Sequence, residues 1–345
     1  MTTAATSNTP AETASTSQPQ LAALLNGAGV SPLAQTGWIR VTGDDRVRWL
    51  NGMATNSVQQ LAEGKGAYNF FLNAQGRIQA DGYIFASADE LLIETASRQI
   101  AALIPYLDHY IIMDDVELAD ISANRYGLTV IGPQAAALLA KLGLLADNLG
   151  DLEFTALPWN STTVTVIHAY SPLVPRFELW ADTPDTAQTL LHALEAAGAT
   201  ATGLPAIESL RILEGAPLYG VDIRDRDLPQ ETNQTRALHF SKGCYLGQEI
   251  VERIRSRGNV HRTFTSFRLE GTPPAPGTAL ESAGKPAGEL TSIGPRLIDD
   301  QGQPFYLALG YARREALDRH EPPNYPGGTA RAVPIPAATE IKLPR

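Results

Sequence analysis

The order of strands and helices in residues 125–197 restricts the fold of this chain more than any other feature of its sequence. A strand, a helix, two strands and a second helix follow one another, at 126–131, 133–142, 162–169, 176–180 and 184–197. Both helices begin with a proline, Pro133 and Pro184, at the position where a missing N–H is tolerated. This β-α-β-β-α order predicts a split βαβ, ferredoxin-like unit.

The flanking regions predict two other kinds of structure. Residues 21–117 are mixed, and their expected strands and helices are a helix at 21–25, a strand at 38–42, a helix at 44–50, strands at 67–72, 78–86 and 90–94, and a helix at 97–110. Residues 73–76 form a turn that makes 67–86 a hairpin. Short strands between Gly and Pro residues at 264–269, 288–293 and 306–312 predict a small β-barrel or sandwich.

These patterns predict the following division of the chain. Residues 1–20, rich in Thr, Ala, Ser and Pro, cannot bury enough apolar surface to offset their ordering entropy and are expected to be a disordered tail. Residues 21–265 form the main α+β region, with 118–203 as an inserted ferredoxin-like subdomain. Residues 266–345 form the C-terminal β-barrel.

Composition excludes several classes of function. The single cysteine rules out an intramolecular disulfide and a multi-cysteine metal site, and the six histidines lack metal-site spacing, so no resident metal is expected. A net charge of −10 disfavours direct nucleic-acid binding, although residues 232–268 carry seven Lys/Arg against two Asp/Glu. No apolar run reaches the ~18 residues of a membrane span, and no basic residue precedes Arg40, so we expect a cytoplasmic protein without a leader.

The segment around the single cysteine, Cys244, carries the strongest chemical signal. Glycines at 243 and 247 flank it and allow tight turns, so we expect the thiol to be reachable. A helix is predicted from about 247 to 257, which puts Cys244 just ahead of a helix N-terminus and two residues from Lys242. Both features favour thiolate over thiol, while Glu249 and Glu252 oppose it. The alternative is an inert, buried cysteine.

The string KGCYLGQE at 242–249, preceded by LPQETN and followed by an Arg-rich helix, closely resembles the signature of the YgfZ family, which is related to the glycine-cleavage T-protein. Further blocks at 41–56, 73–78, 210–220, 288–292 and 308–311 resemble that family in the same order. The resemblance implies an α+β, three-domain T-protein-like ring with ferredoxin-like α/β subdomains and a small C-terminal β-barrel. It also implies a central site for tetrahydrofolate or a one-carbon derivative, with the cysteine motif close to that site.

Two departures from the T-protein bear on activity. Gln79 and Ala80 stand where that enzyme has its Asp-Asp pair, with Asp81 one place late, so the aminomethyltransferase interpretation loses its acid. Leu213 stands where its pterin-binding Glu is expected, with Glu214 displaced by one residue.

Candidate site residues follow from the motif and the resemblance. Cys244 is the functional thiol, supported by Lys242, Gln248 and Glu249, and the candidate folate contacts are Asn73, Arg77, Glu214, Tyr245 and Arg257. Most of these residues also have a purely structural interpretation. Asn73 would stabilise the turn, Arg77 would be a solvated surface cation, and Tyr245 would be a packed ring. Gln248 and Glu249 would stabilise the start of the helix, and the arginines of 253–262 would interact with the negative end of its dipole.

Three functions remain open at this point. The resemblance favours a tetrahydrofolate-binding factor for assembly or repair of iron–sulfur clusters, which supports tRNA-modifying 4Fe–4S enzymes and has those enzymes or assembly proteins as partners. The alternatives are a folate-dependent aminomethyl or methyl transferase and a non-catalytic tRNA or protein adaptor. An assembly factor is favoured over an aminomethyltransferase because of the missing Asp-Asp pair.

Overall fold

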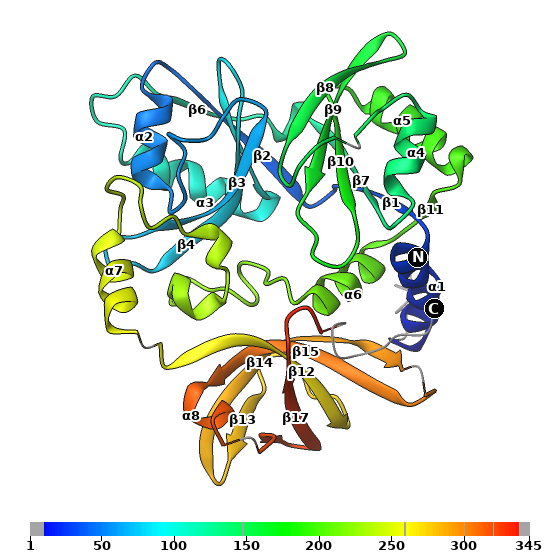
Figure 1. Cartoon of the computed structure of the whole chain (residues 1–345), viewed down its shortest axis with the longest axis vertical. Helices are drawn as coiled ribbons and strands as arrows, with labels where there is room; N and C mark the ends of the chain where they lie inside the picture. Colours follow the sequence, from blue (N-terminus) through cyan, green and yellow to red (C-terminus); the bar gives the residue numbers. More distant parts are fainter. Residues whose placement is uncertain (1–9, 147, 259, 300, 320, 338–345) are drawn as a thin grey trace, which may run out of the picture.

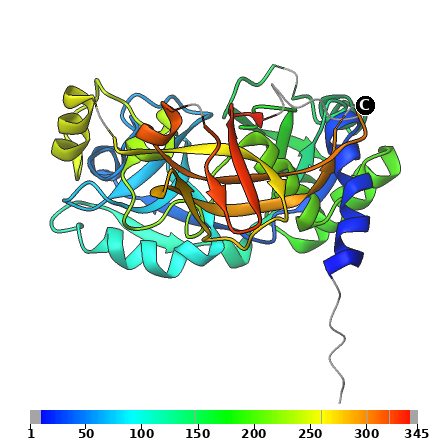
Figure 2. The same cartoon turned by 90° about the horizontal axis from the view of Figure 1, so that it is seen from below.

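The computed structural model describes residues 10–146, 148–258, 260–299, 301–319 and 321–337. Two α/β lobes lie side by side above a β-barrel (Figure 1). Seen from below, the barrel strands run across the junction of the two lobes (Figure 2). Among the described residues, no helix is both long enough and apolar enough to cross a membrane.

The first lobe, residues 36–120, is an antiparallel sheet packed against two helices. Its strand order is β3-β4-β5-β2-β6, and side chains such as Ile39, Phe71 and Leu103 form its core. The register of β3 and β4 confirms the predicted hairpin. The elements are β2 (Thr36–Thr42), α2 (Arg46–Met53), β3 (Lys65–Leu72), β4 (Ile78–Ala86), β5 (Leu91–Ala96), α3 (Ser97–Asp108) and β6 (Glu117–Asp120).

The second lobe is a sheet of strand order β11-β1-β7-β10-β9-β8, with α4 and α5 packed on it. Helix α5 begins where the sequence predicts, because the Thr183 hydroxyl accepts a hydrogen bond from the Thr186 N–H (3.2 Å), and it ends at the left-handed Gly198. The elements are β1 (Gly29–Pro32), β7 (Tyr126–Ile131), α4 (Ala135–Lys141), β8 (Phe154–Trp159), β9 (Thr162–Ala169), β10 (Arg176–Ala181), α5 (Pro184–Ala197) and β11 (Thr200–Ala201).

Two strands of this lobe differ from the expected β-α-β-β-α order. Strand β8 adds a third strand between the helices. Its apolar pattern is interrupted by Pro158, which is tolerated because the strand lies at the sheet edge, where a missing N–H leaves no partner unbonded. Strand β1 comes from the chain before the first lobe and pairs with β7. The second lobe is therefore built from two separate stretches of sequence.

Helix α1 (Pro10–Asn26) differs from the predicted tail of residues 1–20. It contacts α6 (Leu204–Glu214), and Leu21 and Leu24 on α1 are buried beside Leu210 and Leu213 of α6. The burial of these leucines favours a helix that extends N-terminally into the Ala-rich segment. Residues 1–9 of the expected tail lie outside the described residues.

The C-terminal unit is a closed barrel of order β12-β15-β14-β13-β16-β17, which confirms the predicted β-barrel. Its core includes Phe267, Leu290 and Ala308. The elements are β12 (Arg262–Gly271), β13 (Ala279–Ser282), β14 (Lys285–Ile298), β15 (Pro304–Arg313), α8 (Arg314–Leu317), β16 (Asn324–Tyr325) and β17 (Gly328–Val333).

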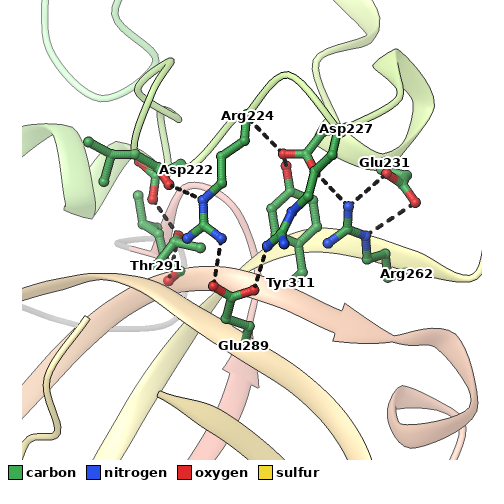
Figure 3. A network of polar contacts seen from close by, with 11 residues as sticks. Asp222, Arg224, Asp227, Glu231, Arg262, Glu289, Thr291 and Tyr311 are labelled. Carbon is green, nitrogen blue, oxygen red and sulfur yellow. Dashed lines mark hydrogen bonds and ion pairs between the residues drawn. The ribbon is translucent and has the colours of Figure 1, made fainter. Parts of the chain in front are cut away.

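Buried ion pairs attach the barrel to the segment after α6 (Figure 3). Fully buried Asp222 accepts hydrogen bonds from Thr291 and from Ser292 (2.7 Å) of β14. Arg262 of β12 pairs with Asp227 (2.6 Å) and with Glu231 (3.1 Å), the latter on η2 (Pro229–Thr232). Arg262, one of the seven basic residues of 232–268, is therefore taken up by the interface.

Candidate functional site

The junction of the two lobes encloses a cavity of about 260 Å³. Strand β4 contributes Asp81, Tyr83 and Phe85, because alternate residues of a strand point to the same side. Strand β10 contributes Arg176 and Glu178 from the opposite lobe by the same rule. Neither lobe alone forms this cavity.

Aromatic rings on the cavity wall are held by a buried cation. Arg236, on η3 (Thr235–Ala237), places its guanidinium 4.1 Å from the ring centre of Tyr68 and 3.9 Å from that of Tyr170. The same group donates a hydrogen bond to the hydroxyl of Tyr83 (3.1 Å). All three tyrosines line the cavity, so Arg236 holds three aromatic rings of its wall in place.

Asp81 supplies one buried carboxyl group to the cavity. It accepts hydrogen bonds from the Tyr68 hydroxyl (2.7 Å) and from the side-chain amide of Gln99 (2.8 Å), and burial raises its pKa. The sequence comparison with the T-protein discounted Asp81 as one place late. Asp81 nevertheless shares the cavity face of β4 with Tyr83 and lines the cavity.

A second acidic group is formed by one carboxyl from each lobe. Glu94 of β5 (8% exposed) and Glu178 of β10 (4% exposed) both line the cavity. Glu178 accepts from Arg176 (2.9 Å) and from the Trp180 indole (3.2 Å), which stabilises its charged form. Two effects raise the pKa of Glu94 well above its usual range: burial is the larger, and the charge of Glu178 is the next. Glu94 therefore keeps its proton to a higher pH than an ordinary glutamate does.

The sequence offered no local signal for these cavity residues. Glu94, Arg176, Glu178 and Arg236 were not candidates, since each is an isolated charged residue in an otherwise ordinary strand or loop. The period-2 alternation of β4 alone would have paired Asp81 with Tyr83 on one face.

Cys244 is exposed, which confirms that the thiol is reachable. It lies in an open depression of about 420 Å³ beside Trp49, Gly52 and Met53 of α2 and Tyr110. Among the described residues, none lines both this depression and the cavity between the lobes. The thiol thus faces a different part of the surface.

Tyr245, the next residue, connects the motif to the cavity wall. Its ring is 7% exposed and packs in one buried cluster with Tyr68, Ile78 and Val251. Burial raises the pKa of Tyr245 to about 12, so it stays a neutral phenol. The cysteine motif therefore adjoins the cavity through Tyr245 while its sulfur faces outward.

Lys242 is buried beneath the motif. Its ammonium group donates to the backbone carbonyls of Asn51 (2.6 Å), Ala54 (2.6 Å) and Asn56 (2.7 Å), at the end of α2. Three N–H bonds meet three acceptors, so the cation neutralises the negative end of the helix rather than contacting sulfur. Burial lowers the pKa of Lys242 to about 8.

Gln248 and Glu249 lie at the first turn of α7 (Gln248–Arg257). Glu249 is largely exposed and forms an ion pair with Arg253 (2.5 Å) one turn later. The Gln248 N–H donates to the Tyr245 carbonyl (3.1 Å). Both contacts are those of helix-start stabilisation.

The proposed folate contacts whose side chains the structure describes are absent from the lining of the cavity. Asn73 accepts from the N–H groups of Gln75 and Arg77 (3.0 Å each), as expected of turn chemistry, and Arg77 donates to the Arg226 carbonyl. Glu214 is buried at the end of α6, where it accepts from the Ser171 hydroxyl and where burial raises its pKa. The side chain of Arg257 lies outside the described residues.

Comparisons with known proteins agree with this arrangement. The crystal structure of the glycine cleavage system aminomethyltransferase T from Bartonella henselae matches with a TM-score of 0.79 and 20% identity, over 95% of this chain and 90% of that one. This likeness confirms the predicted α+β, T-protein-like fold class.

Curated relatives are similar at the level of sequence. Aminomethyltransferases of Frankia alni and Thermus thermophilus are 28% and 27% identical, over 78% and 85% of this chain and 75% and 82% of their own lengths. A chloroplast protein of Arabidopsis thaliana, named provisionally as a transferase, is 27% identical over 84% of this chain, which spans 66% of that protein. The family model described as the GCVT N-terminal domain matches residues 10–242. The chain therefore belongs to the GCVT-domain family.

Proposed function

We propose that this protein binds a reduced folate in the cavity between the lobes, and that it is a YgfZ-type factor in which Cys244 serves assembly or repair of iron–sulfur clusters. The observation that carries the proposal is the chemistry of the cavity wall, where tyrosine rings stand beside buried carboxyl groups. Flat heterocycles stack on such rings, and the amino and ring N–H groups of a pterin suit carboxyl acceptors.

The size of the cavity suits the head of the folate rather than the whole molecule. Its volume of about 260 Å³ is below the ~300 Å³ at which sites for drug-sized ligands begin. The bicyclic ring would occupy the cavity between Tyr83 and Tyr170, and the tail would extend outside it. The folate would supply the one-carbon chemistry, while Asp81, Glu94 and Glu178 would hold the ring.

An exposed thiol away from the cavity supports a role toward another protein. Cys244 lies in an open depression of about 420 Å³, which a partner surface or its metal cluster can reach. Because this depression and the cavity have separate linings among the described residues, folate and thiol would act at separate places, linked through the packing of Tyr245.

Two measurements test the proposal. Tetrahydrofolate should bind saturably by calorimetry, and Glu178→Ala should weaken it at least tenfold, while Cys244→Ser should bind it as the wild type does. In cells that lack the native protein, Cys244→Ser should lower the activity of a 4Fe–4S enzyme, with the exposed Ser241→Ala as the matched control. Unchanged activity with Cys244→Ser would remove the thiol from the proposal.

A second candidate, aminomethyl transfer to folate, is favoured by Asp81. Its carboxyl group lines the cavity, so the acid that the sequence seemed to lack is present. This alternative predicts that the protein transfers the methylene carbon of an aminomethylated carrier to tetrahydrofolate, which yields methylenetetrahydrofolate and releases ammonia and the free carrier. It also predicts that Asp81→Asn abolishes turnover. Folate binding without turnover supports the assembly factor instead.

A further inference from the structure

A second cavity, of about 390 Å³, lies on the side of the lobe junction where α5 meets the β1–β2 linker. Its walls are mainly apolar and include Leu33 of the linker, Leu128 of β7, and Ala187 and Leu191 of α5. Of the described residues, Thr36 alone also lines the folate cavity. It is a separate site with its own surroundings.

A packed aromatic wall separates the two cavities. Trp38 lines the second cavity and meets Trp180 edge-on, with ring centres 5.9 Å apart. Trp180 in turn meets Phe85, which lines the folate cavity, at 5.2 Å. The rings close the space between the cavities.

Arg125 places an incompletely satisfied cation in the second cavity. It follows η1 (Ser122–Asn124), and its side chain is only 19% exposed. Its ion-pair partner within the described part of the chain is Asp182, at 3.9 Å and 82% exposed, and its guanidinium also lies 5.5 Å from the ring centre of Trp180. Within the described part of the chain its guanidinium donates no hydrogen bond, and desolvation lowers its pKa. A mostly buried guanidinium with free donors favours an added anion.

Trp38 gives the cavity a spectroscopic reporter. The residue is 2% exposed and lines the cavity, and its indole N–H is buried without a hydrogen-bond partner among the described residues. A ligand packed beside the ring changes the magnetic environment of this N–H without contacting it. The Trp38 ring and the Arg125 guanidinium thus border the same apolar cavity.

We propose that this second cavity binds a small organic acid, with its carboxylate on Arg125 and its apolar body against the Trp38 ring, Leu128 and Leu191. Arg125 fits a carboxylate because its planar guanidinium presents parallel N–H bonds. The apolar walls exclude inorganic anions as the main ligand, because they would leave that surface uncovered. The proposal does not depend on folate binding.

The test uses the full-length protein labelled with 15N-tryptophan, whose four indole N–H signals are followed by NMR during titration with hexanoate. Hexan-1-ol has the same apolar chain without the charge, and acetate has the charge without the chain. Trp38→Phe assigns the Trp38 signal. We expect saturable movement of that signal with hexanoate, and at least tenfold weaker binding of hexan-1-ol and acetate.

Two variants of Arg125 assign the binding energy. Arg125→Gln should weaken hexanoate at least tenfold, and Arg125→Lys should weaken it less, because Lys keeps the charge but loses the planar pair of N–H bonds. Arg40→Gln removes an exposed positive charge two residues from Trp38 that does not line the cavity, and should bind as the wild type does.

The proposal is overturned if the Trp38 signal of the wild type does not move, or moves equally with hexan-1-ol. It is also overturned if Arg125→Gln and Arg40→Gln lower the affinity equally, since that would reduce the effect to net charge. The wild-type titration decides the matter even if a variant fails to fold.

Discussion

Replacement of Glu94 by Gln should change how the stability of the ligand-free protein depends on pH. Glu94 is buried opposite Glu178, and burial together with the charge of Glu178 favours the protonated form of Glu94. The amide of Gln is close in shape to the neutral acid and can donate to Glu178 as the acid does. Glu94→Gln therefore mimics the protonated form at every pH.

The direction in which the unfolding free energy changes with pH follows from the raised pKa of Glu94. In the unfolded chain this group loses its proton near pH 4.3, whereas the folded protein keeps it to a higher pH, so the folded state binds more protons above pH 4.3. Its stabilising contribution is complete below that pH and is lost as pH rises through the folded pKa. One proton limits the slope to about 1.4 kcal/mol per pH unit.

The measurement is urea denaturation followed by circular dichroism at pH 5, 6, 7 and 8. The difference in unfolding free energy, variant minus wild type, should grow with pH by up to about 1.4 kcal/mol per unit and then level off. Glu249→Gln, at an exposed acid, should give a flat difference. Parallel pH curves for Glu94→Gln and wild type would show that the two acids do not share a proton.

Three further predictions concern the cysteine motif and the barrel. Gly247→Ala should lower stability by at least about 2 kcal/mol, because the φ of Gly247 is +82° and the added Cβ would lie 2.5 Å from the Asn73 carbonyl oxygen. Gly243→Ala, whose added Cβ would have no atom within 4 Å, should be nearly neutral. Thermal denaturation of the two variants compares these effects. Lys242→Met should cost about 1–3 kcal/mol in urea denaturation by leaving three carbonyls without their donor, and equal stability would contradict the cap. Asp222→Ala should cost about 3–5 kcal/mol, because it removes the buried carboxylate that pairs with Arg211 and accepts from the two β14 hydroxyls. A loss below about 1 kcal/mol would show that the barrel is held otherwise.

Elements whose ends carry capping or turn residues could be predicted from the sequence. Helix α5 has a capping threonine, a first-turn proline and a terminal glycine, and the β3–β4 hairpin has an Asn–Gly-bounded turn, so neighbouring residues alone determine both. The exposure of Cys244 followed from its flanking glycines in the same way. The family resemblance extended these local inferences to the whole fold.

The cavity could not be predicted because its residues meet only through tertiary structure. Glu94 and Glu178 belong to different lobes, and no spacing in the sequence indicates that two strands from separate sheets face each other. Lys242 was assigned to the thiol because the two are neighbours in sequence, but its ammonium reaches down to α2 instead. Burial, rather than sequence proximity, decided each of these roles.

The pairing of β1 with β7 has a consequence for synthesis of the chain. Strand β1 ends at Pro32, and its partner begins at Tyr126, after the entire first lobe has been made. At about 5–20 residues per second, the ribosome delivers that partner roughly 5–20 s later. During this interval the hydrogen-bonding edge of β1 in the nascent chain lacks its partner β7. A chaperone that shields the N-terminal segment should therefore raise the yield of native protein.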